Sequence, residues 1–413
     1  MAIGSEIGEH IDDETFDDGL ARKNALILAV AQALGGALAA IVIATAGLAG
    51  GYILPAGQAG FATIPVSLFI VGVALCTLPA QKIMARVGRR PVYIAAASWG
   101  VLAGLVSMQG VLSGLFWMLC AGTFMSGMVS GVVQSYRFAA ADTASPAFRP
   151  KAISWVLAGG VASGIIGPQT VIAFSDFFEP ILFAGAFLGQ ALVAAAMIVV
   201  VMFVDLPKPK KLEAGAVSSA RPISQIAKQP RFQAALSSAI VSYALMSLAM
   251  TAAPIAMIAC GHSVGEAALG IQWHVIGMFG PSFFTGALIA RFGADRIIFA
   301  GFGLLCVCAA VALSGLSVAH FWAALVLLGV GWNFGFLGAT AMLTECYRPE
   351  ERNSVQGWND LIVFGFVALA SFSSGGILHL FGWNAINGLL IPIVGCAALF
   401  LLWRGRRSEP VVA

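Results

Sequence analysis

Charged side chains are scarce in this chain of 413 residues. Asp, Glu, Lys and Arg make up 10% of it, whereas a soluble domain usually carries about 25%. Hydrophobic residues make up 59%, and the mean hydropathy is +0.92. So few charges cannot cover the surface of a soluble protein of this length, and the composition therefore predicts an integral membrane protein.

Apolar runs long enough to cross a hydrocarbon core of roughly 30 Å recur along the whole sequence. The short alternating segments of a membrane β-barrel are not visible. Because every backbone polar group must be hydrogen-bonded inside lipid, the runs are expected to be helices. The predicted fold class is all-α integral membrane, with twelve transmembrane helices at 24–50, 60–82, 91–109, 111–136, 152–174, 180–204, 232–258, 264–290, 296–316, 320–344, 356–378 and 382–403.

Basic side chains are missing from every second loop of this arrangement. All 22 Lys and Arg fall on one side of the twelve spans, while the opposite loops carry Asp176, Glu179, Glu266 and histidines. Basic loops stay on the cytoplasmic side, so we expect both termini there, in a bacterial inner membrane. The net charge of +3 then comes from the basic residues that set the orientation of the chain in the membrane. The expected surroundings are a lipid bilayer, with no nucleic acid, and the expected state is a monomer.

Several familiar motifs are also absent. No Walker sequence is present, so ATP hydrolysis is not the expected driving force. The seven cysteines show neither a disulfide framework nor a zinc spacing. We therefore expect no enzymatic activity and no permanently bound cofactor. Cys260 stands apart, because it lies with His262 at the outer end of the seventh span, where both residues could meet an incoming metal ion.

The longest polar interruption divides six spans from six. It covers 205–231 and holds four prolines, which is typical of a linker. We predict an acidic cytoplasmic tail (1–23), an N-terminal half (24–204), this linker, a C-terminal half (232–404) and a short tail (405–413). The halves repeat weakly, because the run from Ala85 to Arg90 after span two has a counterpart from Ala290 to Arg296 after span eight. Two linked six-span halves describe a secondary transporter.

Two pairs of soft metal ligands stand four residues apart in neighbouring spans. Met246 and Met250 belong to the seventh span, and His274 and Met278 to the eighth. Four residues are about one helical turn, so each pair projects from one face of its helix. Met246 lies as far before the turn near His262 as Met278 lies beyond it. All four are therefore predicted to meet about 15–21 Å below that turn, near the midplane. Three thioethers and one imidazole suit Cu(I).

The run after span two resembles the signature of the major facilitator superfamily, Gly-x-x-x-Asp-Arg-x-Gly-Arg-Arg. The matching positions are Arg86, Gly88, Arg89 and Arg90, whereas the acidic position is occupied by Ala85. In that family the acid belongs to a charge network that latches the two halves in the outward-open state. The resemblance implies the fold and a gating role for the four matching residues, but this chain lacks the acidic partner.

Within that superfamily, the two four-residue motifs resemble those of the CcoA-type copper importers, which supply copper for assembly of cbb3-type cytochrome c oxidase. The resemblance implies a copper importer that works by alternating access, with Met246, Met250, His274 and Met278 as its metal ligands. Copper is then the transported substrate, and copper chaperones are the expected protein partners.

Three other interpretations stay open. The first is a facilitator of an organic solute such as riboflavin, with Trp273 and Phe279 in its pocket and His274 bonded to the solute. The second is a drug/proton antiporter, suggested by Gly160, Gly164, Gly167 and Pro168 in the fifth span, although close helix packing with a kink explains these residues better. The third is a non-transporting membrane sensor. A methionine in a membrane helix more often fills a gap than binds metal.

Further polar residues are expected at the cavity and at its mouth. Gln32, Gln169, Gln272 and Asn333 could line a cavity or bridge helices. Near the cytoplasmic mouth, Glu345, Arg348 and Asp360 are predicted to form gate ion pairs with one another.

Overall fold

The computed structural model describes residues 18–142, 144–145, 148–206, 221–348 and 351–405. Within these ranges the chain is helical almost throughout. Its elements in chain order are α1 (Asp18–Ile53), the 3₁₀ helix η1 (Ala56–Phe61), α2 (Ile64–Val87), α3 (Arg89–Leu112), α4 (Phe116–Val133), α5 (Tyr136–Asp142), α6 (Arg149–Phe174), α7 (Ala184–Val201), α8 (Ile223–Ile226), α9 (Pro230–Ala259), α10 (Val264–Phe279), α11 (Ser282–Phe292), α12 (Ala294–Ser314), α13 (Val318–Thr344) and α14 (Arg352–Gly405).

Eleven helices in the described ranges are long and apolar enough to cross a membrane. The last of them, α14, is counted as one, but its backbone turns at Gly382, where φ is 76°, so it holds two spans. The eighth span consists of α10 and α11, which are separated at Gly280 and Pro281. The prediction of an all-α membrane protein with twelve spanning helices is therefore confirmed.

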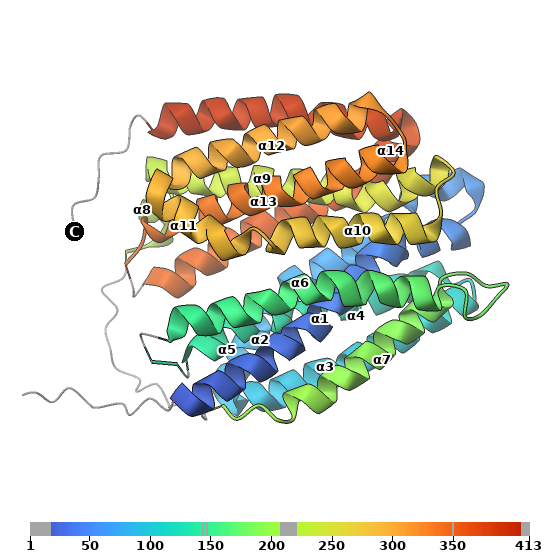
Figure 1. The fold of residues 1–413 in the computed structure, drawn as a ribbon, viewed down its shortest axis with the longest axis horizontal. Coiled ribbons are helices and arrows are strands. Elements are labelled where there is room, and N and C mark those ends of the chain that lie inside the picture. Colours follow the sequence, from blue (N-terminus) through green and yellow to red (C-terminus); the bar gives the residue numbers. More distant parts are fainter. Residues whose placement is uncertain (1–17, 143, 146–147, 207–220, 349–350, 406–413) are drawn as a thin grey trace, which may run out of the picture.

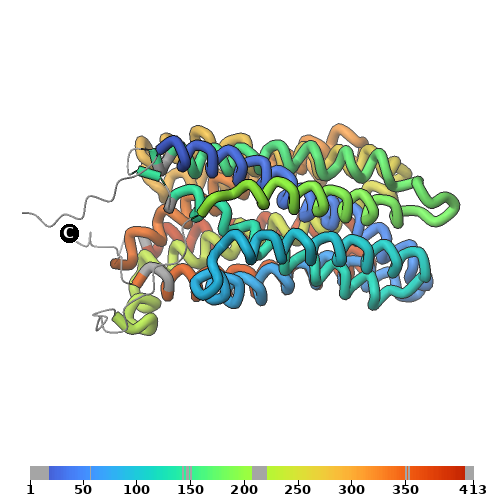
Figure 2. Tube along the Cα trace, turned by 90° about the horizontal axis from the view of Figure 1, so that it is seen from below, coloured from blue at the N-terminus to red at the C-terminus, as the bar shows by residue number. Residues whose placement is uncertain are grey.

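The helices form two bundles that lie side by side (Figure 1). In the first bundle α1 packs against α6, and both α2 and α3 pack against α4; in the second, α9 packs against α14 and α12 against α13. The view turned by 90° shows the helices of both bundles running along the same long direction (Figure 2). The bundles meet mainly where α6 touches α10 and α2 touches α14.

Both described ends of the chain lie at the same end of the molecule. In Figure 1 the start of α1 and the end of α14 are both on the left. We call this the inner end and the opposite one the outer end. The even number of spans produces this arrangement.

The sequence repeat is also a repeat of backbone shape. Gly88 joins α2 to α3 with φ 93° and ψ 162°, and Gly293 joins α11 to α12 with φ 85° and ψ 153°. Such backbone angles are essentially restricted to glycine, because a Cβ would clash with the backbone. The match explains why glycine stands at the same place in both halves.

The helix borders differ from the predicted segment borders at the ends of the chain. The first helix begins at Asp18, inside the predicted tail, and the Asp18 carboxylate accepts hydrogen bonds from the backbone N and the hydroxyl of Ser145, at 3.1 and 2.9 Å. This contact fixes the first turn, which hydropathy alone does not reveal. The rest of that tail (1–17), the middle of the predicted linker (207–220) and the C-terminal tail from 406 lie outside the described residues.

A capping box starts the helix that carries His274 and Met278. The Ser263 hydroxyl accepts a hydrogen bond from the Glu266 backbone N at 3.1 Å, and the Glu266 carboxylate accepts one from the Ser263 backbone N at 2.7 Å. Two free amides of the first turn are satisfied in this way. The cap fixes the start of α10, and with it the depth of every side chain along that helix.

Candidate functional site

A cavity of about 160 Å³ lies between the two bundles. One wall comes from α1, α2, α4 and α6, and the other from α9, α10 and α14. Its lining is largely apolar, with a few amide and hydroxyl groups. The residues that line it are Gln32, Gly35, Gly36, Ala39, Ala40, Ile43, Val66, Phe69, Ile70, Val73, Ser130, Val133, Gln134, Ser163, Tyr243, Met246, Ser247, Met250, Val275, Met278, Phe279, Phe364 and Val367.

Three of the four predicted metal ligands line this cavity. Met246 and Met250 reach it from α9 and Met278 reaches it from α10. Their side chains are 1%, 6% and 8% exposed. A four-residue spacing on each of two adjoining helices thus brings three thioethers to one space.

His274 does not join them. Its side chain is fully buried, and its Nδ1 lies 2.8 Å from the backbone oxygen of Leu325 on α13. Because a carbonyl oxygen only accepts, Nδ1 carries the hydrogen, which leaves a lone pair on Nε2 in the neutral ring. No described residue bonds to Nε2. The predicted meeting of all four side chains is therefore not what the structure shows, because His274 faces the neighbouring helix of its own half.

The described residues also hold no group of three or more His, Cys, Asp or Glu side chains that could bind a metal ion. Any metal in the central cavity would therefore depend on thioethers. Thioethers bind soft ions such as Cu(I) and are poor ligands for Zn²⁺ or Mg²⁺.

Aromatic side chains give the cavity flat apolar walls. Phe69 stands on the N-terminal side, and Phe279, Phe364 and Tyr243 stand on the other. Tyr243 also packs edge-on against Phe364, with ring centroids 5.5 Å apart. Its place could have been found from the sequence, because it precedes Met246 by three residues on the same helix. Such walls suit a planar ring system.

Only some of the polar and aromatic residues that were predicted at the cavity line it. Gln32 lines the cavity, whereas Gln169 and Gln272 bond to each other at 3.0 Å between α6 and α10. Trp273 is 41% exposed and is not a lining residue, so its predicted place in the pocket is wrong, since it lies on the opposite face of α10 from the cavity.

Asn333 braces the break in the eighth span. Its amide nitrogen donates to the backbone oxygen of Met278 at 2.6 Å and to the Ser282 hydroxyl at 2.7 Å. Its amide oxygen accepts from the Thr285 hydroxyl at 2.7 Å. Asn333 therefore supports the cavity wall from behind and does not line it.

Hydroxyl groups join the halves on the outer side of the cavity. The Ser67 hydroxyl from α2 lies 2.9 Å from that of Ser371 on α14, which is 3.3 Å from that of Thr251 on α9. All three residues are buried. On another side, Cβ atoms placed at Gly160 and Gly164 would touch Phe279 and Val275 of α10. The two glycines thus allow close packing of α6 on α10.

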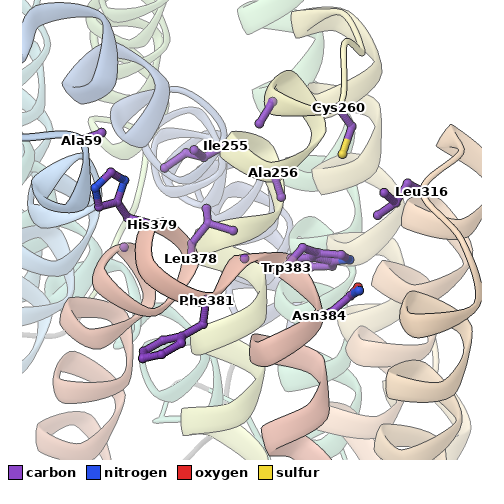
Figure 3. Close-up of a pocket in the computed structure, with 13 residues that line it drawn as sticks. Ala59, Ile255, Ala256, Cys260, Leu316, Leu378, His379, Phe381, Trp383 and Asn384 are labelled. Atoms are coloured by element: carbon purple, nitrogen blue, oxygen red, sulfur yellow. The ribbon is translucent and has the colours of Figure 1, made fainter. Parts of the chain in front are cut away.

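A separate cavity of about 450 Å³ opens at the outer end (Figure 3). Cys260 and His379 stand at different parts of its wall, and Trp383 and Asn384 follow the bend of α14 at Gly382. Cys260 is exposed, as a residue on an entrance route must be. His262 is engaged elsewhere, because a ring nitrogen lies 2.8 Å from the backbone oxygen of Leu316.

The ion pairs near the inner end differ from those predicted. Glu345 bonds to Arg231 at 2.8 Å, and Arg231 also bonds to Asp295 at 2.7 Å. Arg231 stands at the start of α9, between the inner ends of α12 and α13, and so reaches both carboxylates. The predicted pairing of Glu345, Arg348 and Asp360 with one another is therefore wrong, and their gating role stays a prediction.

An ion pair with a buried carboxylate fastens the segment before α8 to the C-terminal half. The Arg221 guanidinium donates to both carboxylate oxygens of Glu351, at 2.7 Å each. The backbone amides of Arg221 and Arg348 donate to the same carboxylate, at 2.9 Å each. The Arg221 hydrogen bond, followed by those from the backbone, holds the pKa of Glu351 well below its usual range.

The four residues of the superfamily signature surround the turn between α2 and α3. Gly88 forms that turn, and the Arg90 guanidinium donates to the backbone oxygen of Met202 at 2.7 Å, just after α7. Arg86 is exposed and Arg89 is half-buried. Their predicted part in gating stays a prediction.

A cavity between two six-span bundles, with separate contacts at its outer and inner sides, is typical of a membrane transporter. The chain belongs to the Major Facilitator Superfamily, which it matches over residues 25–280 and 235–413.

Sequence relatives refine this assignment. The riboflavin transporter RfnT of Brucella anthropi is 47% identical over 388 residues, which are 94% of this chain and 97% of that one. The uncharacterized MFS-type transporter YddS of Bacillus subtilis is 28% identical over 97% of this chain and 95% of its own length.

Solved structures confirm the fold. The nucleoside transporter NupG superposes with a TM-score of 0.72 at 13% identity, covering 92% of this chain and 99% of its own. A bacterial homologue of the human lysosomal transporter Spinster, in an inward-facing and unoccupied conformation, gives 0.65 at 17% identity, covering 94% and 98%.

Proposed function

We propose that this protein carries a planar organic solute of the flavin class across a bacterial inner membrane by alternating access. The observation that carries the proposal is the 47% identity, over nearly the full length of both chains, with a riboflavin transporter. The aromatic lining of the central cavity supports it, because Phe69, Tyr243, Phe279 and Phe364 offer faces and edges to an isoalloxazine ring. The amides of Gln32 and Gln134 offer donors and acceptors to its polar edge.

The size of the cavity sets a condition on this function. Pockets for organic ligands usually measure about 300–1,000 Å³, and this one measures about 160 Å³. The halves must therefore separate before a flavin can enter. The hydroxyl contact between Ser67 of α2 and Ser371 of α14 is among the contacts to be broken on the outer side. An uncharged contact of this kind suits a gate that opens repeatedly.

Copper import is the second candidate, because three thioethers line one cavity. Met246, Met250 and Met278 would supply the ligands that Cu(I) prefers. In that function His274 would have to turn its free Nε2 toward them, which requires a rotation of α10 or of the imidazole.

The orientation is part of the proposal. The Lys and Arg residues of the described ranges lie at or near the inner ends of the helices, so this end faces the cytoplasm by the positive-inside rule. Both termini then lie in the cytoplasm, and the protein acts as a monomer with its pathway between its own two halves.

The test is uptake of radioactive riboflavin and radioactive copper, run in parallel by cells with and without the protein. We expect expression to raise riboflavin accumulation several-fold and to leave copper accumulation unchanged. Copper accumulation alone would refute the flavin proposal and support the second candidate. Purified protein in liposomes loaded with unlabelled solute then shows exchange in the absence of other cell components.

A further inference from the structure

The outer cavity has room for an organic solute in the conformation of this structure. It measures about 450 Å³, whereas the central cavity measures about 160 Å³. Pockets for organic ligands usually measure about 300–1,000 Å³, so only the larger of these two cavities falls within that range. If the two cavities lie on one pathway, the solute therefore fills the outer one first.

One face of α9 runs along both cavities. Ser247 lines the central cavity, Thr251 takes part in the hydroxyl contacts, and Ile255 lines the outer cavity. These residues are four apart, which is about one helical turn, so they follow one another along the same face of the helix. At about 1.5 Å per residue, the two cavities are about 12 Å apart along this helix.

The same order is repeated on α14. Val367 lines the central cavity, the Ser371 hydroxyl lies 2.9 Å from that of Ser67, and Gly375 lines the outer cavity. These three positions of α14 are again four apart. The hydroxyl groups of Ser67, Thr251 and Ser371, which we call the hydroxyl layer, therefore form a partition between two cavities that share two helix faces. The outer cavity thus lies on the path from the outer end to the centre.

The outer cavity also spans the boundary between the two halves. Ala59 of η1 comes from the N-terminal half, and the remaining lining residues come from the C-terminal half. A Cβ atom placed at Gly60 of η1 would lie 3.7 Å from the ring of His379 on α14. One placed at Gly375 would lie 2.6 Å from the backbone oxygen of Gly60. The wall of this cavity therefore changes when the halves separate on the outer side.

Trp383 gives the outer cavity a fixed aromatic side chain. It follows the turn at Gly382, lines the cavity and is 8% exposed. Its ring packs against Phe321 with centroids 5.2 Å apart, and Phe321 packs edge-on against His262 at 5.7 Å. A ring that is already held by its neighbours loses little freedom when a planar ligand packs on it, which favours binding.

Polar groups without formal charge accompany this ring. Cys260, His379 and Asn384 line the cavity and are exposed (Figure 3). Among the described residues of its wall there is no Lys, Arg, Asp or Glu. Imidazole and amide groups offer hydrogen-bond donors and acceptors. The wall therefore suits an uncharged planar ring system whose edge carries hydrogen-bonding groups.

We propose that the outer cavity is a first binding site for the solute, in which a molecule of the flavin class packs on Trp383 and bonds to His379 and Asn384. This inference rests on the proposed function, because it takes the same class of solute. Binding there keeps the solute beside the hydroxyl layer until the outer side opens. The solute then moves about 12 Å deeper into the central cavity.

Cys260 makes occupancy of the outer cavity measurable. Its thiol is exposed in the cavity wall, so a solute bound there should shield it from a membrane-impermeant maleimide. The other cysteines that are not buried (Cys76, Cys306 and Cys396) are first replaced by Ser. The labelling rate is then measured on ice with intact cells that express the full chain, over a series of riboflavin concentrations. Cys260→Ser in the same background gives the residual labelling.

We expect saturating riboflavin to slow the labelling of Cys260 several-fold. In Trp383→Leu the riboflavin concentration that halves the rate should rise by up to about tenfold, because an aromatic packing partner is lost. Trp117→Leu is the matched control, since Trp117 stands at the outer end of α4, is 71% exposed and lines neither cavity. Its protection should equal that of wild type.

A second variant covers the case in which Trp383→Leu does not reach the membrane. Asn384→Leu changes an exposed side chain and should raise the same riboflavin concentration about threefold, because one hydrogen bond is lost. Wild-type protection in Asn384→Leu and in any Trp383→Leu protein that reaches the membrane would mean that riboflavin acts on Cys260 from the central cavity. That result would overturn the proposal.

Uptake of radioactive riboflavin by the same cells separates this inference from the proposed function. Uptake without protection of Cys260 overturns the outer site and leaves the proposed function standing, with the cavity left to other occupants such as lipid. Protection without uptake supports the outer site and refutes flavin transport. The absence of both uptake and protection refutes both proposals.

Discussion

The three methionines of the central cavity allow a replacement that distinguishes the two candidate substrates. Leu has nearly the volume of Met but no sulfur, so exchanging the two in a packed site usually costs less than about 1.5 kcal/mol. The variant to make is Met246→Leu, Met250→Leu and Met278→Leu together. The three side chains are at most 8% exposed, so each replacement stays inside the same apolar wall.

The size of the effect differs sharply between the two functions. For a flavin, the loss is confined to sulfur–aromatic contacts worth about 0.3–1.5 kcal/mol each. Even the upper value for one contact corresponds to roughly a tenfold weaker affinity. Transport at saturating riboflavin should therefore continue, with a KM raised by at most about tenfold for each such contact that is lost. For Cu(I), the variant removes all three thioether ligands, and no transport should remain.

The assay is uptake of both labelled substrates over a concentration series, together with the melting temperature of the purified variants. Met257→Leu is the control, because Met257 is fully buried on the same helix but does not line the central cavity. Its uptake should equal that of wild type. If the triple variant melts like the control yet loses riboflavin transport altogether, the view of these methionines as a passive apolar wall is refuted.

Three further outcomes are expected. Glu351→Gln should destabilise the purified protein by about 1–3 kcal/mol at pH 7, because Arg221 loses its charged partner but is 30% exposed and so keeps part of its hydration. Since folding lowers the pKa of Glu351, this difference should be complete above its ordinary value of 4.5 and should shrink as the pH falls below it, as melts across pH 3–8 can show. Asn333→Leu should lower stability by about 2 kcal/mol, because the oxygen of Met278 loses its donor, and an unchanged melting temperature would contradict the bracing role. A membrane-impermeant thiol reagent should label Cys260 from outside intact cells, and labelling from the cytoplasmic side alone would reverse the proposed orientation.

The sequence was sufficient for the spans, because a bilayer demands long apolar runs that few other structures contain. It was also sufficient for the depth of the methionines, since depth follows from counting residues from a turn. The rotation of each helix about its own axis, which decides which side chains face the cavity, cannot be obtained by counting residues from a turn. His274 lies about 40° around α10 from Met278 but about 100° from Val275, at 100° per residue. The cavity faces the side of Val275, so His274 falls at the edge, against α13.

The charged contacts show the same limit. Glu345 and Arg348 are close in sequence, which suggested a local pair, but Glu345 bonds to Arg231 from another helix. Which helices adjoin at the inner end is a property of the packed bundle.

The matching turns at Gly88 and Gly293 indicate that the two halves of this chain descend from one duplicated unit. Beside them Ala85 and Arg86 still match Ala290 and Arg291, but most other side chains have diverged, while both glycines have kept the same unusual backbone angles. A gene that was doubled and fused leaves two copies free to drift, except where the backbone shape admits one residue only. Torsion angles in such places outlast sequence similarity, and comparing them between the halves of other membrane proteins would reveal duplications that alignments no longer detect.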